Sequence, residues 1–126
     1  MPHSLKLCLL ILLVACKKTP QASERPLKGH WRATAFYVGD SITNVDVSHV
    51  TLELTNNSRF SFVNNIGQAE AGTYIYTDSL LITTDTMVSP PIEKAMHVVK
   101  VSKDSLILRM NFNGKEALMY FRDSLR

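Results

Sequence analysis

The sequence has little net charge and none of the motifs by which nucleic-acid-binding proteins are recognised. Its 126 residues include 14 basic and 11 acidic side chains, which gives a formal net charge of only +3. The basic residues are dispersed along the chain, whereas binding to nucleic acid requires a clustered basic face. We therefore expect no nucleic-acid partner.

Patterns typical of catalysis or metal binding are also missing. His30, His49 and His97 show no His-x-x-x-His spacing, and no Cys-x-x-Cys pair occurs, so we expect no metal site. No serine lies in a Gly-x-Ser-x-Gly elbow, and no glycine-rich phosphate loop is present. Glu53 and Glu70 are conceivable as paired carboxylates, but exposed strand and loop positions explain them more simply. We predict that the protein is not an enzyme and needs no cofactor.

Only two cysteines occur, and the position of the second is informative. Lys6 precedes the apolar run from Leu7 to Ala15, which has the length of an export signal and is shorter than the roughly 20 apolar residues of a spanning helix. The run ends in Leu-Val-Ala-Cys, which resembles the lipobox of bacterial lipoproteins. The resemblance implies that residues 1–15 are a cleaved lipoprotein signal peptide and that Cys16 is lipidated. An ordinary secretory signal with a chance cysteine, or a buried cytosolic strand, are the alternatives.

Lipidation of Cys16 would anchor the protein to a membrane through its N-terminus. Residues 16–26 are polar without apolar periodicity, which predicts a tether. Lys17 stands where an aspartate would, in many bacteria, retain a lipoprotein in the inner membrane, so the resemblance implies an envelope protein of the outer membrane. Cys8 leaves with the signal, so no thiol remains for a disulfide and the fold depends on its core. We expect one monomeric domain over residues 27–126.

From Lys28 onward, apolar residues recur with period two in short runs separated by turn residues, which predicts an all-β domain. The first strand would place Trp31, Ala33, Ala35 and Tyr37 on one face. In total we expect eight strands, over residues 30–38, 50–55, 59–63, 72–77, 80–84, 95–102, 106–112 and 117–122.

Sequential hairpins of this kind predict an eight-stranded antiparallel up-and-down meander that closes into a barrel. Asn56-Asn57 and Asn113-Gly114 favour tight hairpins, because Asn and Gly tolerate positive φ. A barrel with a loop-rich mouth and a closed base is the shape that holds a small ligand. A two-sheet sandwich is the alternative architecture. The turns at one end are tight, whereas long loops gather at the other end, over residues 39–49, 64–71, 85–94 and 113–116.

The start of the domain carries a family resemblance. Gly29-His30-Trp31 resembles the Gly-x-Trp motif of lipocalins, whose tryptophan plugs the closed end of an eight-stranded barrel. In lipocalins an arginine near the last strand packs across that tryptophan, and Arg122 lies at the same end of the expected meander. The Gly-Thr-Tyr sequence at residues 72–74 is similar to that of small lipocalin-like bacterial lipoproteins. The resemblance implies a lipocalin-like barrel with Trp31 and Arg122 as its structural plug.

The expected barrel suggests a carrier of a small hydrophobic ligand. By the direction of their strands, Tyr37, Phe62, Met110 and Phe112 would surround the mouth and contact the ligand. Core filling is the other common role of such aromatic and methionine side chains. In that case the protein would be a non-catalytic interaction module with a filled barrel, whose long loops contact an envelope protein. An apolar cavity that opens between the long loops would distinguish the first function from the second.

Overall fold

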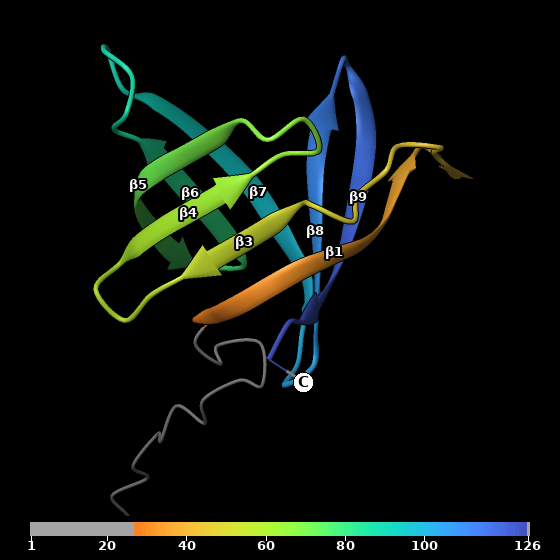
Figure 1. Ribbon diagram of the computed structural model, residues 1–126, viewed down its shortest axis with the longest axis horizontal. Coiled ribbons are helices and arrows are strands. Elements are labelled where there is room, and N and C mark those ends of the chain that lie inside the picture. Colours follow the sequence, from red (N-terminus) through yellow and green to blue (C-terminus); the bar gives the residue numbers. More distant parts are fainter. Residues whose placement is uncertain (1–26, 126) are drawn as a thin grey trace, which may run out of the picture.

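The computed structural model describes residues 27–125, which form a closed antiparallel β-barrel (Figure 1). The predicted signal peptide, the predicted lipidation site Cys16 and the predicted tether at residues 16–26 lie outside the described residues. The described chain forms nine strands: β1 (Gly29–Val38), β2 (Ser41–Ile42), β3 (Thr51–Leu54), β4 (Arg59–Val63), β5 (Ala69–Thr77), β6 (Leu80–Asp85), β7 (Ile92–Val101), β8 (Ser105–Phe112) and β9 (Lys115–Asp123).

The wall of the barrel is the predicted meander of eight antiparallel strands, since β2 is only two residues long and pairs with the end of β1. β1 closes the barrel because it pairs on both of its edges. Its residues Gly29 to Arg32 pair with β3, and the stretch from Trp31 to Val38 pairs with β9. The prediction of an all-β barrel is confirmed, and a sandwich of two separate sheets is excluded for this part of the chain.

No helix within residues 27–125 has the length and apolar character needed to cross a membrane.

A β-bulge interrupts the alternation of β1. The register between β1 and β9 shifts between Ala33 and Ala35, so Thr34 is an extra residue on the β1 side. Its Oγ1 donates a hydrogen bond to the carbonyl oxygen of Tyr120 at 3.2 Å. Because side chains in a strand point alternately to the two faces, one extra residue exchanges the faces for the rest of the strand.

The bulge decides which β1 side chains face the interior. Trp31 and Ala33 precede it and are buried inside the barrel, as predicted. Beyond the bulge, Phe36 is the inward residue and is 6% exposed, whereas Ala35 and Tyr37 face outward. The predicted shared face of Trp31, Ala33, Ala35 and Tyr37 is therefore wrong in its second half.

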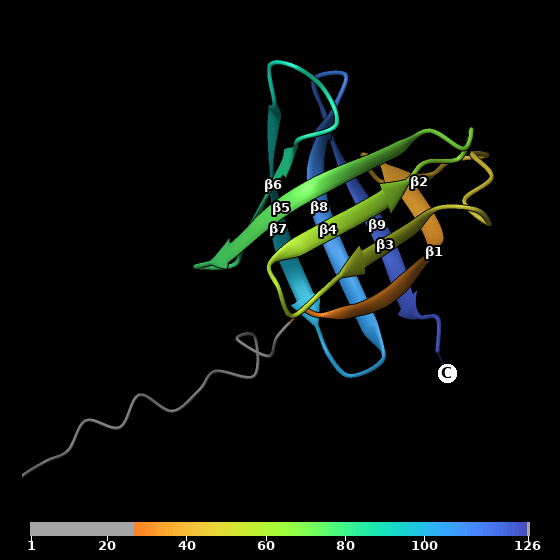
Figure 2. The ribbon, with the colours of Figure 1, turned by 60° about the vertical axis from the view of Figure 1, so that its left-hand side comes forward.

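The connections differ between the two ends of the barrel, as the sequence predicted (Figure 2). Tight turns at one end comprise residues 55–58, 78–79 and 102–104, and we call this the closed end. The loops at the opposite end comprise residues 39–50, which include β2, and residues 64–68, 86–91 and 113–114. Three of these loops are shorter than expected, because β5 already begins at Ala69, β7 at Ile92 and β9 at Lys115.

Two hairpin turns were predicted from their dipeptides. Asn113 and Gly114 both have positive φ, 52° and 80°, as expected for a tight hairpin. In the turn after β3 the residue with positive φ is Ser58, at 58°, and not the predicted Asn56 or Asn57. The reason is that this turn spans four residues, so its left-handed position falls immediately before β4.

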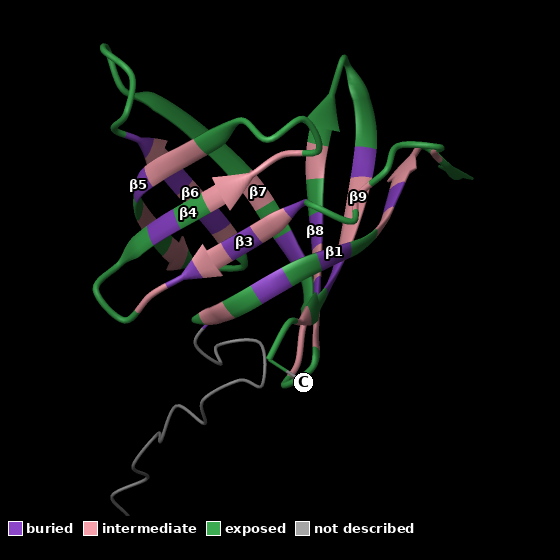
Figure 3. Ribbon diagram, in the orientation of Figure 1, coloured by how far each residue is buried: buried purple, intermediate pink, exposed green. Residues whose placement is uncertain are grey.

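Buried residues alternate along the strands that meet at the closed end, and much of the core lies there (Figure 3). Leu27, Trp31, Leu54, Leu106 and Phe121 are each at most 4% exposed. The indole Nε1 of Trp31 donates to the carbonyl oxygen of Leu27 at 2.9 Å, so its one polar group is satisfied within the core. Toward the loop-rich end Phe36 is still buried, but other interior side chains, among them Phe62, Met110 and Met119, are only partly buried.

Candidate ligand-binding site inside the barrel

An apolar cavity of about 110 Å³ lies inside the barrel, above the buried core. Side chains from seven strands line it, and Leu52, Phe60 and Phe121 belong to the core itself. Most of the other lining side chains are also apolar. We call this space the inner cavity.

A wider space of about 640 Å³ lies at the loop-rich end of the barrel, and we call it the mouth. Small-molecule sites typically have volumes of about 300–1,000 Å³. The mouth has the size of such a site, and the shared walls place the inner cavity directly beneath it. The mouth and the inner cavity have six lining residues in common: Phe62, Glu70, Lys94, Met96, Met110 and Met119.

Three of the four residues predicted to contact a ligand lie at these spaces. Phe62 and Met110 line both the inner cavity and the mouth. Phe112 lines the mouth alone, is 45% exposed, and meets the ring of Phe36 edge to face at a centroid distance of 5.4 Å. Contact of these residues with a ligand remains a prediction.

Tyr37 lies on the other side of the barrel wall. It is opposite Leu118 in β9, and its ring packs against that of Tyr120 on the outer surface, with 5.2 Å between the centroids. The expectation that Tyr37 faces the mouth is wrong, because the bulge at Thr34 turns the rest of β1 over. Phe36 takes the inward position and lines the mouth, and it was missed in the sequence.

Trp31 and Arg122 also lie on opposite faces of the wall. Trp31 is inside the closed end, where it packs among buried apolar residues. Arg122 is exposed and pairs across the sheet with Arg32 on the outer face, because Phe121 before it occupies the inward position. The expectation that Arg122 packs across Trp31 is therefore wrong.

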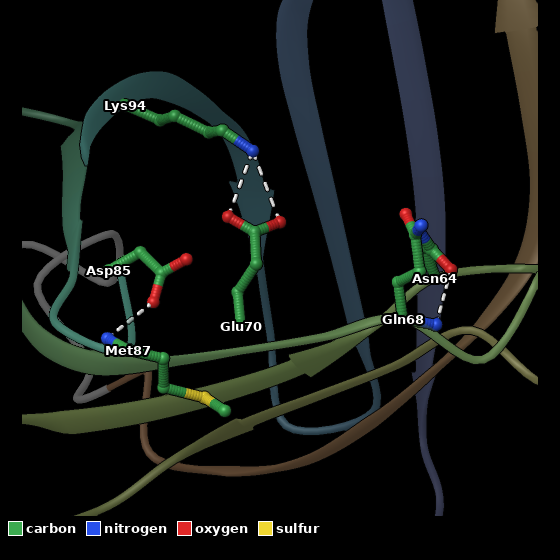
Figure 4. Close-up of polar contacts among 6 residues, drawn as sticks. All are labelled: Asn64, Gln68, Glu70, Asp85, Met87 and Lys94. Carbon is green, nitrogen blue, oxygen red and sulfur yellow. Dashed lines mark hydrogen bonds and ion pairs between the residues drawn. The ribbon is translucent and has the colours of Figure 1, made fainter. Parts of the chain in front are cut away.

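An ion pair lies in the walls that the inner cavity and the mouth share (Figure 4). The Nζ atom of Lys94 is 2.9 Å and 3.1 Å from the two carboxylate oxygens of Glu70. Glu70 in β5 is opposite Phe62, and Lys94 in β7 is opposite the buried Thr83, so both side chains belong to the inward face. Their side chains are 24% and 54% exposed, respectively.

The sequence prediction missed this pair because it assigned both residues to loops. The strands extend further than expected, and each residue continues the alternation of its strand. Alternate residues of a strand share a face. Glu70 is four residues before Tyr74 in β5, and Lys94 is two and four residues before Met96 and Val98 in β7, so each charged residue shares the face of these side chains. This spacing is the signal in the sequence that could have placed both charged groups on the inward face.

Side-chain hydrogen bonds fix two loops beside the mouth (Figure 4). The carboxylate of Asp85, at the end of β6, is 5% exposed and accepts the backbone N–H of Met87 at 2.9 Å. In the loop between β4 and β5, the Nδ2 of Asn64 donates to Oε1 of Gln68 at 3.1 Å. Both bonds hold the loop close to the strands that it connects.

Gly72 allows β5 and β6 to approach closely in the wall. It lies opposite Phe60 in β4 and Asp85 in β6. A Cβ atom at Gly72 would lie 1.9 Å from the carbonyl oxygen of Thr84, which is far inside van der Waals contact with backbone. No residue other than glycine fits here without a shift of the strands.

Within residues 27–125, no group of three or more His, Cys, Asp or Glu side chains is placed to hold a metal ion. Comparison of the chain with protein-family models, with curated proteins and with solved structures found no match. Function is therefore inferred from the geometry of the barrel and from the N-terminal sequence.

Proposed function

We propose that this protein is a lipid-anchored protein of the bacterial cell envelope that binds or carries a small hydrophobic ligand in its lipocalin-like barrel. The observation that carries this proposal is that the inner cavity adjoins the mouth, with which it shares six lining residues. A fully filled barrel would leave no such space. The closed eight-stranded architecture is compatible with the lipocalin-like resemblance of the sequence at Trp31.

The two volumes suggest how a ligand would lie. The inner cavity, at about 110 Å³, is too small for a whole drug-sized molecule, whereas the mouth, at about 640 Å³, is large enough. An apolar end would enter the inner cavity and the remainder would occupy the mouth. Met96, Met110 and Met119 line both spaces, and flexible methionine side chains adapt to irregular apolar shapes.

The proposed anchor and the mouth would lie at opposite ends of the barrel. Leu27 is the first described residue, and its carbonyl oxygen accepts the hydrogen bond from Trp31 at the closed end. A tether over residues 16–26 would therefore join the barrel at the closed end. A lipid on Cys16 would leave the mouth open to solvent or to a partner.

The anchor is tested by Cys16→Ser. We expect this variant to lose incorporation of labelled palmitate and to leave the membrane fraction, because acyl chains contribute about 0.8 kcal/mol per buried CH₂ to membrane binding. Cys8→Ser is the matched control, since it alters a cysteine of the predicted signal and should keep the label. Incorporation of label by Cys16→Ser at the wild-type level would refute lipidation at this residue. Recovery of the wild type mainly with inner-membrane markers would contradict the outer-membrane location.

One observation favours the second function, a non-catalytic interaction module that contacts an envelope protein through its loops. Several apolar side chains on the mouth loops are strongly exposed: Ile66 is 70% exposed, and Ile42 and Met87 are each 63% exposed. Exposed apolar groups that gather at one end of a protein are typical of an interaction site. The same groups would also surround the entrance for a hydrophobic ligand.

Titration with hydrophobic fluorophores distinguishes the two functions. The closed barrel and its core are formed by residues within 27–125, so the chain from residue 16 to 126 with Cys16→Ser is expected to fold without its lipid. We expect saturable binding that Phe62→Glu abolishes, because the substitution places a charge in the wall of both spaces. Ile75→Glu is the control, since Ile75 is 63% exposed in β5.

The outcome assigns the function. Binding that is lost in Phe62→Glu and kept in Ile75→Glu supports the carrier, provided that both variants keep the circular dichroism spectrum of the wild type. Absence of binding by the wild type would end the carrier proposal and favour the interaction module. Binding that both variants keep would place the probe on the surface instead of in the barrel.

A further inference from the structure

The charged groups inside the barrel are few and paired. Among the described residues that line the inner cavity or the mouth, Glu70 and Lys94 are the only ones with charged side chains. They stand where the two spaces meet, with Phe62, Met96 and Met110 among the apolar residues beside them. A ligand that fills both spaces would lie against this pair.

The pair has hydrogen-bonding capacity left over. An ammonium group has three N–H donors, and two are accounted for by the Glu70 oxygens at 2.9 Å and 3.1 Å from Lys94 Nζ. One donor of Lys94 remains, and each oxygen of Glu70 keeps a further acceptor site. The side chain of Lys94 is 54% exposed, so this capacity is accessible from the mouth.

The pair carries no net charge, which limits the ligand that it suits. A carboxylate would be attracted by Lys94 and repelled by Glu70, whereas an alkylammonium would be attracted by Glu70 and repelled by Lys94. An uncharged group that has both a donor and an acceptor gains from both partners and is opposed by neither. Hydroxyl and primary amide groups have this property.

We propose that Glu70 and Lys94 form the recognition site for the polar head of the ligand, and that the ligand is an uncharged amphiphile whose head is a hydroxyl or a primary amide. This inference rests on the proposed function, because it assumes that the barrel binds a hydrophobic molecule. The head accepts a hydrogen bond from Lys94 and donates one to Glu70. The apolar part of the ligand contacts the aromatic and methionine side chains beside the pair.

The experiment compares ligands that differ only in their head. Decanol, decanamide, decanoate and decylammonium compete at neutral pH, below their aggregation concentrations, with a bound hydrophobic fluorophore on the chain from residue 16 to 126 with Cys16→Ser. We expect decanol and decanamide to displace the fluorophore at lower concentrations than decanoate or decylammonium. Tighter binding of decanoate or of decylammonium by the wild type would overturn the assignment of an uncharged head.

Single variants should change the preference in opposite directions. Glu70→Gln leaves Lys94 without its counter-charge, so decanoate should bind on the order of tenfold more tightly. Lys94→Met leaves Glu70 alone, so decylammonium should gain by a similar factor. Glu93→Gln and Lys100→Met are the matched controls, because they remove the same charges from exposed outer positions of β7 and should change nothing.

A double variant with the two charges exchanged is a further test in case the single variants do not fold. Glu70→Lys combined with Lys94→Glu keeps one charge of each sign and should keep the preference for decanol and decanamide. If the fluorophore binds but the preference is the same in all folded variants, the pair does not recognise the head, and the carrier function still stands. If neither the fluorophore nor any of the four ligands binds the wild type, the proposed carrier function itself fails.

Discussion

At the closed end of the barrel most interior side chains are almost fully buried, whereas at the mouth several interior side chains of the same strands are partly or largely exposed. Leu54 and Leu106 are 2% and 0% exposed, but Phe112, in the same strand as Leu106, is 45% exposed. Burial of apolar area stabilises a fold by roughly 25 cal/mol per Å². The difference indicates that the closed end supplies most of the stability and that the mouth is free to serve binding.

Trp31→Ala tests the stabilising role of the closed end, and we expect it to lower the unfolding free energy more than the other variants. Truncation of a large buried aromatic residue costs about 3–5 kcal/mol of unfolding free energy, and Trp31 is 4% exposed. We expect a smaller loss for Phe62→Ala, because Phe62 is only partly buried in the shared wall. Urea unfolding followed by circular dichroism measures both, since Trp31 is the only tryptophan and its fluorescence disappears with the substitution.

The ligand provides the counter-test for Trp31. If Trp31→Ala kept the wild-type unfolding free energy but lost fluorophore binding, Trp31 would be a ligand contact. The distinction between a stabilising closed end and a binding mouth would then be lost.

Gly72→Ala examines the wall between the two ends. The added methyl group would lie 1.9 Å from the carbonyl oxygen of Thr84, so β5 and β6 must separate or bend. Insertion of a methyl group into a tightly packed region costs about 1–3 kcal/mol, and contact with backbone places this site at the upper end. Thr73→Ala, at the adjacent exposed position, is the control and should change the unfolding free energy little. Equal stability of Gly72→Ala and wild type would show that the strands separate easily.

The architecture could be predicted from the sequence because its signals are local. Alternation and turn residues fixed eight strands and the end at which the loops gather, and the structure confirms both. These signals survive errors of one or two residues in strand ends. The same errors do affect predictions about single side chains, since a shift of one residue exchanges the two faces of a strand.

The errors in the candidate site follow from that sensitivity. The bulge at Thr34 is hidden because Ala35, Phe36 and Tyr37 are all compatible with an inward position. Arg122 lies at the predicted end, but Phe121 beside it takes the interior. The sequence therefore predicted the correct end of the barrel for Tyr37 and Arg122, but not the face of the wall on which their side chains lie.

Tyr74→Phe should have a moderate effect that depends on pH. The Tyr74 hydroxyl donates to the carbonyl oxygen of Thr55 at 2.9 Å near the closed end, and loss of one such bond costs about 1 kcal/mol at neutral pH. Burial raises the pKa of Tyr74 above its usual value, because burial disfavours the phenolate. The stabilisation by the neutral phenol is complete below about pH 10, the pKa of an unfolded tyrosine, and is lost as the pH rises through the folded pKa.

The wild type and Tyr74→Phe should therefore approach one another in stability at alkaline pH. Urea unfolding of both proteins at neutral pH and at pH values above about 10 measures the gap. Other titrating groups are common to the two proteins and cancel in the difference. A gap that widens with pH would show that the phenolate is stabilised in the fold, contrary to the effect of burial.

Met110→Trp should change the stability little and lower ligand affinity strongly. Met110 lines both the inner cavity and the mouth, so a larger side chain there can occupy existing space, and we expect the unfolding free energy to change by less than about 1.5 kcal/mol. The added indole would fill the space where the inner cavity and the mouth meet, so fluorophore affinity should fall on the order of tenfold or more.

Leu118→Trp is the control, because Leu118 lies on the outer side of β9, opposite Tyr37. A loss of affinity in Met110→Trp at nearly constant stability would separate binding from folding. Unchanged affinity would show that the ligand stays in the mouth and does not reach the inner cavity.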